Sequence, residues 1–354
     1  MIFRSLIALL TMAGLASAQE PASIPSNFNT ADWIFSTTPP DKSSENEGAF
    51  RFICNASHNA KVDPIVYPGQ ADVGHLHTFA GNTTVNKDST YSSLRQNGNS
   101  TCQGGPLNRS SYWMPSMMTA GGQIVMPDYL VIYYKGKTNS AKLPRGLRYI
   151  FGKNMANLKA PLGIQQWGAG WPEKPEWECT STATKTATIP QNCASGRGSI
   201  IVRVASPDCW DGVNLDSANH RSHMAYQVPR LGPACPPSHP IRLPQFSFAA
   251  VYTQTSLGEA NTWYLASDRM IMSDGSVHNE PAGSTFHTDW FGAWDDGVLN
   301  TWHTNCIAKA LSCVAFSLGD STAGKAPSGF TFDTPNPRLV DPPAAVPPPV
   351  GGGG

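Results

Sequence analysis

The chain has 354 residues, of which 25 are Lys or Arg and 25 are Asp or Glu, so its formal net charge at pH 7 is zero. Charged residues make up only 14% and form no run of like charge, which excludes nucleic acid and an anionic membrane as main partners. The ten tryptophans could line a sugar-binding surface or fill the core, and we expect a polysaccharide as partner and a monomeric chain.

Residues 1–18 have the features of a secretory signal peptide. Arg4 precedes an apolar run over residues 6–15, and the small residues 16–18 form a cleavage pattern. This run is too short to cross a membrane, and no later segment is long and apolar enough. We expect the mature protein to begin at Gln19 and to be secreted into the extracellular space.

The cysteines also indicate an oxidising compartment. Their even number, eight, predicts four disulfides. Pairing them in sequence order gives Cys54–Cys102, Cys179–Cys193, Cys209–Cys235 and Cys306–Cys313, although other pairings are possible. Four N-glycosylation sequons, which fit export from a eukaryotic cell, begin at Asn55, Asn82, Asn99 and Asn108. Because sequons also arise by chance, we do not expect all four to carry glycans.

Short runs rich in Val, Ile, Tyr and Phe, bounded by Gly, Pro, Asn or Asp, predict β-strands. These runs cover residues 123–134, 147–152, 199–205, 223–228, 246–253, 262–272 and 329–332. The one predicted helix covers residues 298–313, with Asp295 or Asp296 as its cap. An unbroken helix would hold Cys306 and Cys313 about 10 Å apart, too far for a disulfide. Either the helix ends earlier or the cysteines pair differently.

We expect residues 19–333 to form one domain. Its predicted fold is mainly β with long loops and few helices, a β-sandwich or jelly-roll-like fold stapled by disulfides. From Pro335 the chain becomes rich in Pro and ends in Gly. Residues 334–354 therefore predict an extended linker or tail rather than a packed element.

The stretch DVGHLHTFAGN, residues 72–82, carries two histidines one residue apart. On an extended backbone His75 and His77 point to the same side, with their Cα atoms about 6.5 Å apart. Two imidazoles on one face can act as acid, base or metal ligands near neutral pH. The alternative, that both rings only hydrogen-bond to loop carbonyls, has similar weight.

Three further stretches combine histidine with acidic or basic residues. They contain His58 and Asp63; then Asp208, Asp211, Asp216, His220, Arg221 and His223; and then His287, Asp289, Trp290 and Trp294. An aspartate beside a histidine commonly orients the imidazole and fixes its tautomer. For each of the three aspartates of the middle stretch taken singly, turn formation is the favoured interpretation, and it is weaker for the clusters taken together. His223 is predicted to begin a strand of which one face lines a cleft.

Four stretches of the chain resemble a family of secreted fungal and bacterial proteins, the domain of unknown function 1996. They are KVDPIVYPGQADVGHLHTFAGN, LNRSSYWMPSM, CWDGVNLDSANHRSHMAY and FHTDWFGAWD. The resemblance extends from about residue 29 to residue 315. It implies a carbohydrate setting, because some members carry WSC or other sugar-binding modules after a similar linker. It implies no reaction and no catalytic residue.

Three functions remain open. The first is a carbohydrate-active enzyme that cleaves glycosidic bonds of a cell-wall or extracellular polysaccharide in a Trp-lined cleft, because such cleavage needs two carboxylates and needs no cofactor. Its catalytic candidates are Asp63, Asp211, Asp216, Asp289, His223 and His287, and its substrate-binding candidates are His58, His75, His77, Arg221, Tyr226, Trp290 and Trp294. In a lyase variant, Tyr226 or a histidine is the base and Arg221 neutralises a uronate.

The second function is a metalloenzyme acting on polysaccharide, with zinc or copper held by His75, His77 and either His223 or His287. The third is a non-catalytic protein that binds cell-wall glycans. For both enzyme hypotheses we expect His75, His77, Asp63, His223 and His287 to converge around one cleft.

Overall fold

The computed structural model describes residues 20–155, 174–190, 193, 198–228, 234–253, 262–271, 277–331 and 339–344. The predicted signal peptide and its cleavage point before Gln19 lie outside these residues. None of the helices in the described part is long and apolar enough to cross a membrane.

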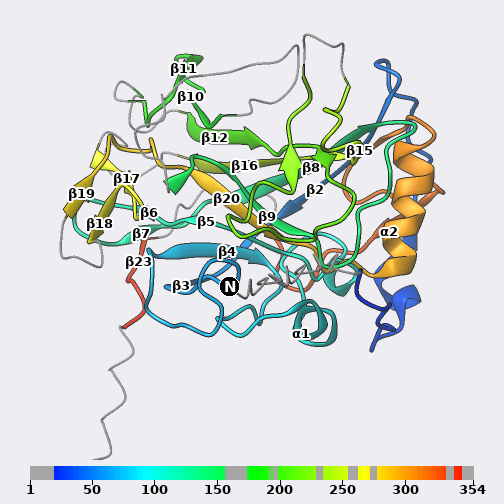
Figure 1. Ribbon diagram of the computed structural model, residues 1–354, viewed down its shortest axis with the longest axis horizontal. Coiled ribbons are helices and arrows are strands. Elements are labelled where there is room, and N and C mark those ends of the chain that lie inside the picture. Colours follow the sequence, from blue (N-terminus) through cyan, green and yellow to red (C-terminus); the bar gives the residue numbers. More distant parts are fainter. Residues whose placement is uncertain are drawn as a thin grey trace, which may run out of the picture.

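Two large sheets form the body of the molecule (Figure 1). The seven-stranded sheet has, in spatial order, β11 (Thr184–Thr186), β10 (Glu176–Cys179), β12 (Ser199–Ala205), β16 (Gln245–Thr253), β8 (Tyr129–Lys137), β2 (Glu47–Cys54) and β21 (Ser312–Cys313). The five-stranded sheet has β3 (Ala56–Ala60), β4 (His77–Gly81), β5 (Ser111–Pro115), β20 (His287–Phe291) and β9 (Arg148–Gly152). Every pairing in both sheets is antiparallel except that of β2 with β21.

The two sheets pack face to face through aromatic side chains. The ring of Phe246, on β16, lies 5.5 Å from that of Tyr112, 5.3 Å from that of Phe151 and 6.0 Å from that of Trp290, measured between centroids. These contacts join the seven-stranded sheet to β5, β9 and β20. The fold is therefore a mainly β sandwich with few helices, as the sequence predicts.

The outer face of the five-stranded sheet carries a second, smaller apolar cluster. Side chains alternate along a strand, so Trp113 and Asp289 face away from the sandwich interior into which Tyr112 and Trp290 point. Trp113 packs against Phe79, with 5.4 Å between ring centroids. The covering residues come from the segments around β4 and from α1 (Tyr91–Gln96), and include Ile65, Val85, Tyr91 and Leu94. The candidate site lies on this covered outer face.

Smaller elements surround the sandwich. A four-stranded sheet contains β17 (Tyr264–Leu265), β6 (Met117–Met118), β7 (Ile124–Val125) and β23 (Leu339–Val340), and a three-stranded sheet contains β14 (Met224–Ala225), β13 (Cys209–Trp210) and β15 (Ile241–Arg242). Two pairs are β1 (Ile34–Ser36) with β22 (Thr322–Gly324) and β18 (Arg269–Ile271) with β19 (Val277–Asn279). Two 3-10 turns are η1 (Thr30–Trp33) and η2 (Gly105–Leu107). Strand β23 lies in the segment predicted to be an unpacked tail, yet it pairs with β7.

Three of the predicted strands occur almost as expected, as β9, β12 and β16. The run over residues 123–134 instead forms two strands, β7 and β8, with Pro127 between them; proline lacks the N–H that a continuous ladder requires. The run over residues 262–272 is likewise divided, into β17 and β18. Of residues 223–228 only β14 is a strand, and residues 329–331 form none. His223 therefore precedes its strand rather than beginning it.

The predicted helix over residues 298–313 is shorter in the structure. Helix α2 (Asp296–Trp302) begins after Asp295, whose carboxylate accepts a hydrogen bond from the backbone N–H of Val298. One π-helical segment, η5 (His303–Ile307), follows and ends the helix. The chain then turns back into β21, so that Cys306 and Cys313 reach a Cα–Cα distance of 5.9 Å and form a disulfide. Of the two alternatives, the helix ends earlier than residue 313, and the predicted pairing is confirmed.

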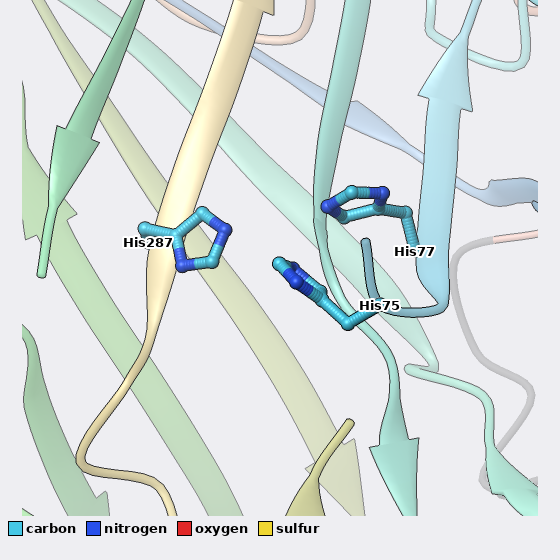
Figure 2. A group of neighbouring side chains, drawn as sticks. All are labelled: His75, His77 and His287. Carbon is cyan, nitrogen blue, oxygen red and sulfur yellow. The ribbon is translucent and has the colours of Figure 1, made fainter. Parts of the chain in front are cut away.

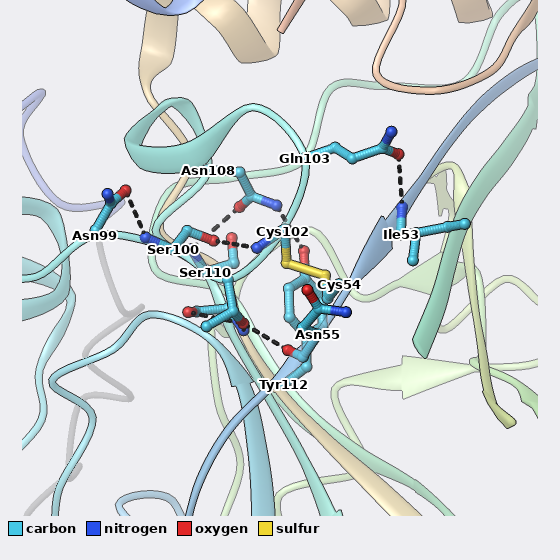
Figure 3. Close-up of a disulfide and its surroundings, with 12 residues drawn as sticks. Ile53, Cys54, Asn55, Asn99, Ser100, Cys102, Gln103, Asn108, Ser110 and Tyr112 are labelled. Carbon is cyan, nitrogen blue, oxygen red and sulfur yellow. Dashed lines mark hydrogen bonds between the residues drawn. A yellow bond between two sulfur atoms is a disulfide. The ribbon is translucent and has the colours of Figure 1, made fainter. Parts of the chain in front are cut away.

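All four disulfides follow sequence order, as predicted. Cys54–Cys102 joins the last residue of β2 to the loop before β5, where the side chain of Gln103 accepts a hydrogen bond from the N–H of Ile53 (Figure 3). The same figure shows the sequon residue Asn108, whose amide donates to the hydroxyl of Tyr112.

Two of the four sequon asparagines are buried. Asn108 is fully buried, and so is Asn82, whose amide nitrogen donates to the carbonyls of Leu94 and Asn97. A glycan cannot be accommodated at either position in the folded chain. Only Asn55 and Asn99 have side chains that reach the surface in part.

Candidate metal centre

Three histidines from separate parts of the chain converge beside the five-stranded sheet. His77 is the first residue of β4 and His287 the first of β20, with β5 between these strands, and His75 lies in the loop before β4. Figure 2 shows the three imidazoles pointing toward one another. Ring centroids lie 4.3 Å apart for His75 and His77, 5.0 Å for His75 and His287, and 6.3 Å for His77 and His287.

Backbone carbonyls fix the orientation of two of these rings. Nδ1 of His77 lies 2.9 Å from the carbonyl oxygen of Val62, and Nδ1 of His287 lies 2.8 Å from that of Thr285. A carbonyl only accepts, so each Nδ1 must carry the proton and each Nε2 keeps its lone pair. Nε2 of His77 and Nε2 of His75 are buried and have no hydrogen-bond partner among the described residues. This is the arrangement in which outer carbonyls orient histidine ligands toward a metal ion.

The electrostatic environment keeps all three imidazoles uncharged. Burial lowers the pKa of His287 to about 3, helped by the proximity of His77. Burial, together with the neighbouring His77 and His287, holds the pKa of His75 well below its usual value. Burial also lowers the pKa of His77, although Asp63 acts in the opposite direction. Neutral imidazole is the form that binds a metal ion, so the cluster is ready to do so at neutral pH.

The distances fit a transition-metal ion. One ligand nitrogen from each histidine can be chosen so that all three lie within 4.8 Å of one another. In a tetrahedral zinc site with Zn–N bonds of about 2.0 Å, ligand nitrogens are about 3.3 Å apart. Small side-chain rotations close this difference. Three imidazole nitrogens suit zinc or copper and are a poor match for calcium or magnesium, which prefer oxygen.

A buried carboxylate stands next to the three histidines. Both oxygens of Asp289 are buried and lack a hydrogen-bond partner among the described residues, and Oδ2 lies 3.9 Å from Nε2 of His287. Burial raises the pKa of Asp289 well above its usual value, Asp63 raises it further, and Arg221 opposes this. An unpaired buried carboxylate is costly, and a cation bound by the histidines would compensate for it.

Asp63 and Arg221 lie near the cluster and are themselves held in place. Oδ1 of Asp63 accepts hydrogen bonds of 2.9 Å from the N–H groups of Ile65 and Val66. The guanidinium of Arg221 donates to the carbonyl oxygens of Gly152 and Lys153, at 3.3 and 2.8 Å. Arg221 interacts electrostatically with both His287 and Asp289. The HRSH motif, residues 220–223, therefore contributes its arginine to the site.

His223, from the same motif, lies apart from the three converging histidines. Its Nδ1 lies 2.8 Å from the hydroxyl of Ser217, and its Nε2 lies 3.0 Å from the carbonyl oxygen of Arg148. Arg148 pairs with Phe291 at one end of β9 and β20, whereas His287 pairs with Gly152 at the other. Four residues of strand, about 13 Å, separate these ends. The expectation that His223 shares the cleft is not met.

The carboxylates of Asp211 and Asp216 also serve the local fold. Oδ1 of Asp211 accepts hydrogen bonds of 2.8 Å from the N–H groups of Val213 and Asn214, so this residue closes a turn. Asp216 makes an ion pair of 2.8 Å with Arg148, and its other oxygen bonds to Nδ1 of His220 at 2.9 Å. Neither carboxylate takes part in the histidine cluster.

The remaining substrate-binding candidates have mixed positions. Trp290 and Trp294 are 0% and 4% exposed and belong to the main core, so they present no platform to a sugar. His58 stacks on Phe79 at 4.8 Å between centroids and bonds to the carbonyl of Val85. Tyr226 lines a pocket, as does Arg221.

This pocket opens beside the histidine cluster and has a volume of about 320 Å³. Its walls include Gly152, Lys174, Pro207, Arg221, Met224 and Tyr226. Gly152 is the register partner of His287, which places the pocket directly next to the cluster. Sequence reasoning missed Gly152 and Lys174, because neither lies in a motif and only the fold brings them here.

Comparison with known proteins gives one match. The sequence profile of a family described as domain of unknown function (DUF1996) matches residues 63–294. The chain belongs to this family. The matched region of the DUF1996 protein contains all three converging histidines and also Asp63, Asp289 and Arg221. No curated protein and no solved structure matches the chain.

Proposed function

We propose that this DUF1996 protein is a secreted metalloenzyme that acts on an extracellular polysaccharide through a zinc ion held by His75, His77 and His287. The observation that carries the proposal is the convergence of three neutral imidazoles, two of which have a buried Nε2 that no described residue hydrogen-bonds. Histidine rings left this way inside a protein need an explanation, and a metal ion supplies one.

The chemistry follows from the number of ligands. Three histidines leave a zinc ion with an open coordination position, which is the pattern of catalytic zinc sites. A zinc ion held there would supply an activated water as nucleophile near neutral pH. Asp289, whose Oδ2 lies 3.9 Å from Nε2 of His287, would be a carboxylate beside the site that can take up a proton. We therefore assign a hydrolytic reaction.

Location and substrate class rest on other features. Four disulfides fit an oxidising, extracellular compartment, as does the signal-peptide pattern of residues 1–18. The pocket beside the cluster combines an aromatic ring, Tyr226, with cationic side chains, and its size suits one sugar ring better than a folded macromolecule. A polysaccharide chain lying across this pocket would bring a linkage to the metal.

Metal-independent glycosidic cleavage is the second candidate, and one observation favours it. Burial raises the pKa of Asp289 well above its usual value, which favours the protonated form that a general acid requires, and Asp63 is a second carboxylate that interacts with it. In this case the three histidines would bind substrate and hold no metal.

One experiment separates the candidates. The full secreted chain is purified without chelator, its metal content is measured by mass spectrometry, and hydrolysis is assayed on a panel of polysaccharides. We expect about one equivalent of zinc, loss of hydrolysis on chelation and recovery on adding zinc. Full activity in a metal-free protein would contradict the zinc proposal and support the acid–base candidate. Recovery with copper alone, together with oxidised products, would overturn the hydrolytic assignment.

A further inference from the structure

We infer that the pocket lined by Arg221, Lys174 and Tyr226 binds the carboxylate of a uronic acid residue, so that the substrate is an acidic polysaccharide. Cleavage of the bound polysaccharide rests on the proposed zinc function, but binding of the uronate by this pocket does not. It assigns a ligand class to a cavity that the metal chemistry leaves unexplained.

The charge of the pocket is the first argument. Two of its lining residues, Arg221 and Lys174, are cationic, and no described lining residue is acidic. Lys153 stands behind the wall and interacts electrostatically with Lys174. The acidic groups that face these cations are few: Glu280 interacts with Lys153, and Asp289 interacts with Arg221. A net positive cavity is complementary to an anion.

The second argument is the way in which Arg221 is held. Its two terminal nitrogens donate to the carbonyls of Gly152 and Lys153, which fixes the plane of the guanidinium at the pocket wall. These bonds use only part of its set of N–H donors. A guanidinium held in a fixed plane matches a planar carboxylate better than it matches a spherical ion, because two parallel hydrogen bonds can form.

The third argument is the uncharged part of the wall. Met224, Pro207 and the ring of Tyr226 add apolar surface to the lining of the same pocket. The hydroxyl of Tyr226 donates to the carbonyl of Ala205 at 2.8 Å, which fixes the position of the ring. An aromatic face beside a cationic group suits a sugar ring that carries a carboxylate, since the ring packs on the aromatic side chain and the charge meets Arg221.

The position of the pocket relates binding to reaction. Gly152 forms part of the wall and pairs with His287 across β9 and β20. Glycine is required at this point, because a Cβ there would lie 2.9 Å from Cα of His287 and the backbone has a φ of +87°. Arg221 donates to the carbonyl of Gly152, so a uronate held by Arg221 would bind beside β9, the strand next to the one that carries the proposed zinc ligand His287.

The test compares two probes that differ only in charge. Binding of trigalacturonic acid and of its methyl-esterified form to the full secreted chain is measured by calorimetry, with zinc bound and after chelation. We expect the acid to bind about tenfold or more tightly than the ester, and this preference to weaken at high salt. Trimers bearing sulfate esters in place of carboxylates form the third arm.

Variants locate the effect. Arg221→Gln and Lys174→Gln should each reduce binding of the acid by about tenfold or more and leave binding of the ester unchanged. The matched control is Arg51→Gln, because Arg51 is exposed and its neighbours in β2, Phe50 and Phe52, are the ones that point into the sandwich. If Arg221→Gln does not fold, Lys174→Gln, at a partly exposed position, still tests the pocket.

The binding experiments can refute the uronate inference independently of the zinc proposal. Equal binding of acid and ester, or loss of preference in Arg51→Gln as well, would overturn the uronate inference even in a protein that holds zinc. Equal binding of the sulfated trimer would also overturn it, in favour of a general anion site. A preference that persists in a protein with no metal would leave the pocket assignment standing while the zinc proposal fails.

Discussion

The two histidine-containing regions, the cluster of His75, His77 and His287 and the HRSH motif, differ in how their ring nitrogens are used. Burial lowers the pKa of His75 in the first region and that of His223 in the second. His223 of the HRSH motif has partners for both of its nitrogens, whereas the Nε2 atoms of His75 and His77 have none among the described residues. Burial and a lowered pKa are thus common to a structural histidine and to a candidate ligand. What distinguishes the ligand is a lone pair that the fold leaves unused.

The largest expected difference between the regions is in metal content. His77→Ala or His287→Ala should remove essentially all bound zinc and reduce hydrolysis by at least about a hundredfold, because two remaining imidazoles hold zinc poorly. His223→Ala should keep about one equivalent of zinc. Elemental analysis of the purified variants measures this. Loss of zinc in His223→Ala alone would reverse the roles of the two regions.

The second difference is in stability without metal. His223→Ala should lower the free energy of unfolding by about 2–4 kcal/mol, because it removes two hydrogen bonds and a buried ring. His75→Ala should have a smaller effect in the zinc-free protein, since Nε2 of His75 makes no hydrogen bond that could be lost. Denaturant unfolding in the presence of chelator measures both values. A larger loss in His75→Ala would show that its ring has a structural partner.

The third difference is in acid sensitivity. His287 has a folded-state pKa of about 3, below its unfolded value of about 6.5, so the unfolded chain binds more protons between these values. The neutral ring of His287 makes its full contribution to the free energy of unfolding above pH 6.5. This contribution decreases as the pH falls toward 3, by up to about 1.4 kcal/mol per pH unit.

The difference in unfolding free energy between the zinc-free wild type and His287→Gln isolates this contribution. We expect this difference to decrease as the pH falls from 6.5 to 3. The corresponding difference for His223→Gln should also decrease with falling pH, because burial lowers the pKa of His223 as well. A pH-independent difference for His287→Gln would show that its ring is not buried in the uncharged form.

The smallest expected effect is that of Asp211→Asn in the HRSH region. Asparagine can accept the same turn hydrogen bonds, so the cost in unfolding free energy should be about 1 kcal/mol or less, and hydrolysis should be unchanged. The measurement is the rate of hydrolysis by Asp211→Asn compared with that by Asp289→Asn, which should be much lower. A comparable loss of rate in both variants would restore Asp211 as a catalytic residue.

Local sequence pattern was sufficient for part of the fold. Runs of β-branched and aromatic residues identified β12 and β16, because strand propensity is a local property. The four disulfides join cysteines that are consecutive in the sequence, so pairing in sequence order predicted them correctly. Where helix α2 ends stayed open, since η5 is an interruption that composition does not mark.

Of the candidate site, only the pair His75 and His77, which lie close together in the sequence, could be predicted. The spacing of His75 and His77 placed both rings on one side, but their third partner depended on which strands lie beside β4. The strand order β4, β5, β20 brings His287, and not His223, close to His75 and His77. Strand order depends on contacts between residues far apart in the sequence. The burial of Trp290 and Trp294 could not be predicted either, because residue type alone does not distinguish a tryptophan in the core from one that binds sugar at the surface.

Two of the three converging histidines stand on strands, and the third, His75, stands on the loop that precedes β4. A metal ion bound by all three would be a reversible cross-link that fastens this loop to the sheet. The folded population would then depend on the free metal concentration, and each tenfold increase above the dissociation constant would add about 1.4 kcal/mol of stability. In a compartment where free zinc varies, the lifetime of the protein against proteases would follow the metal supply.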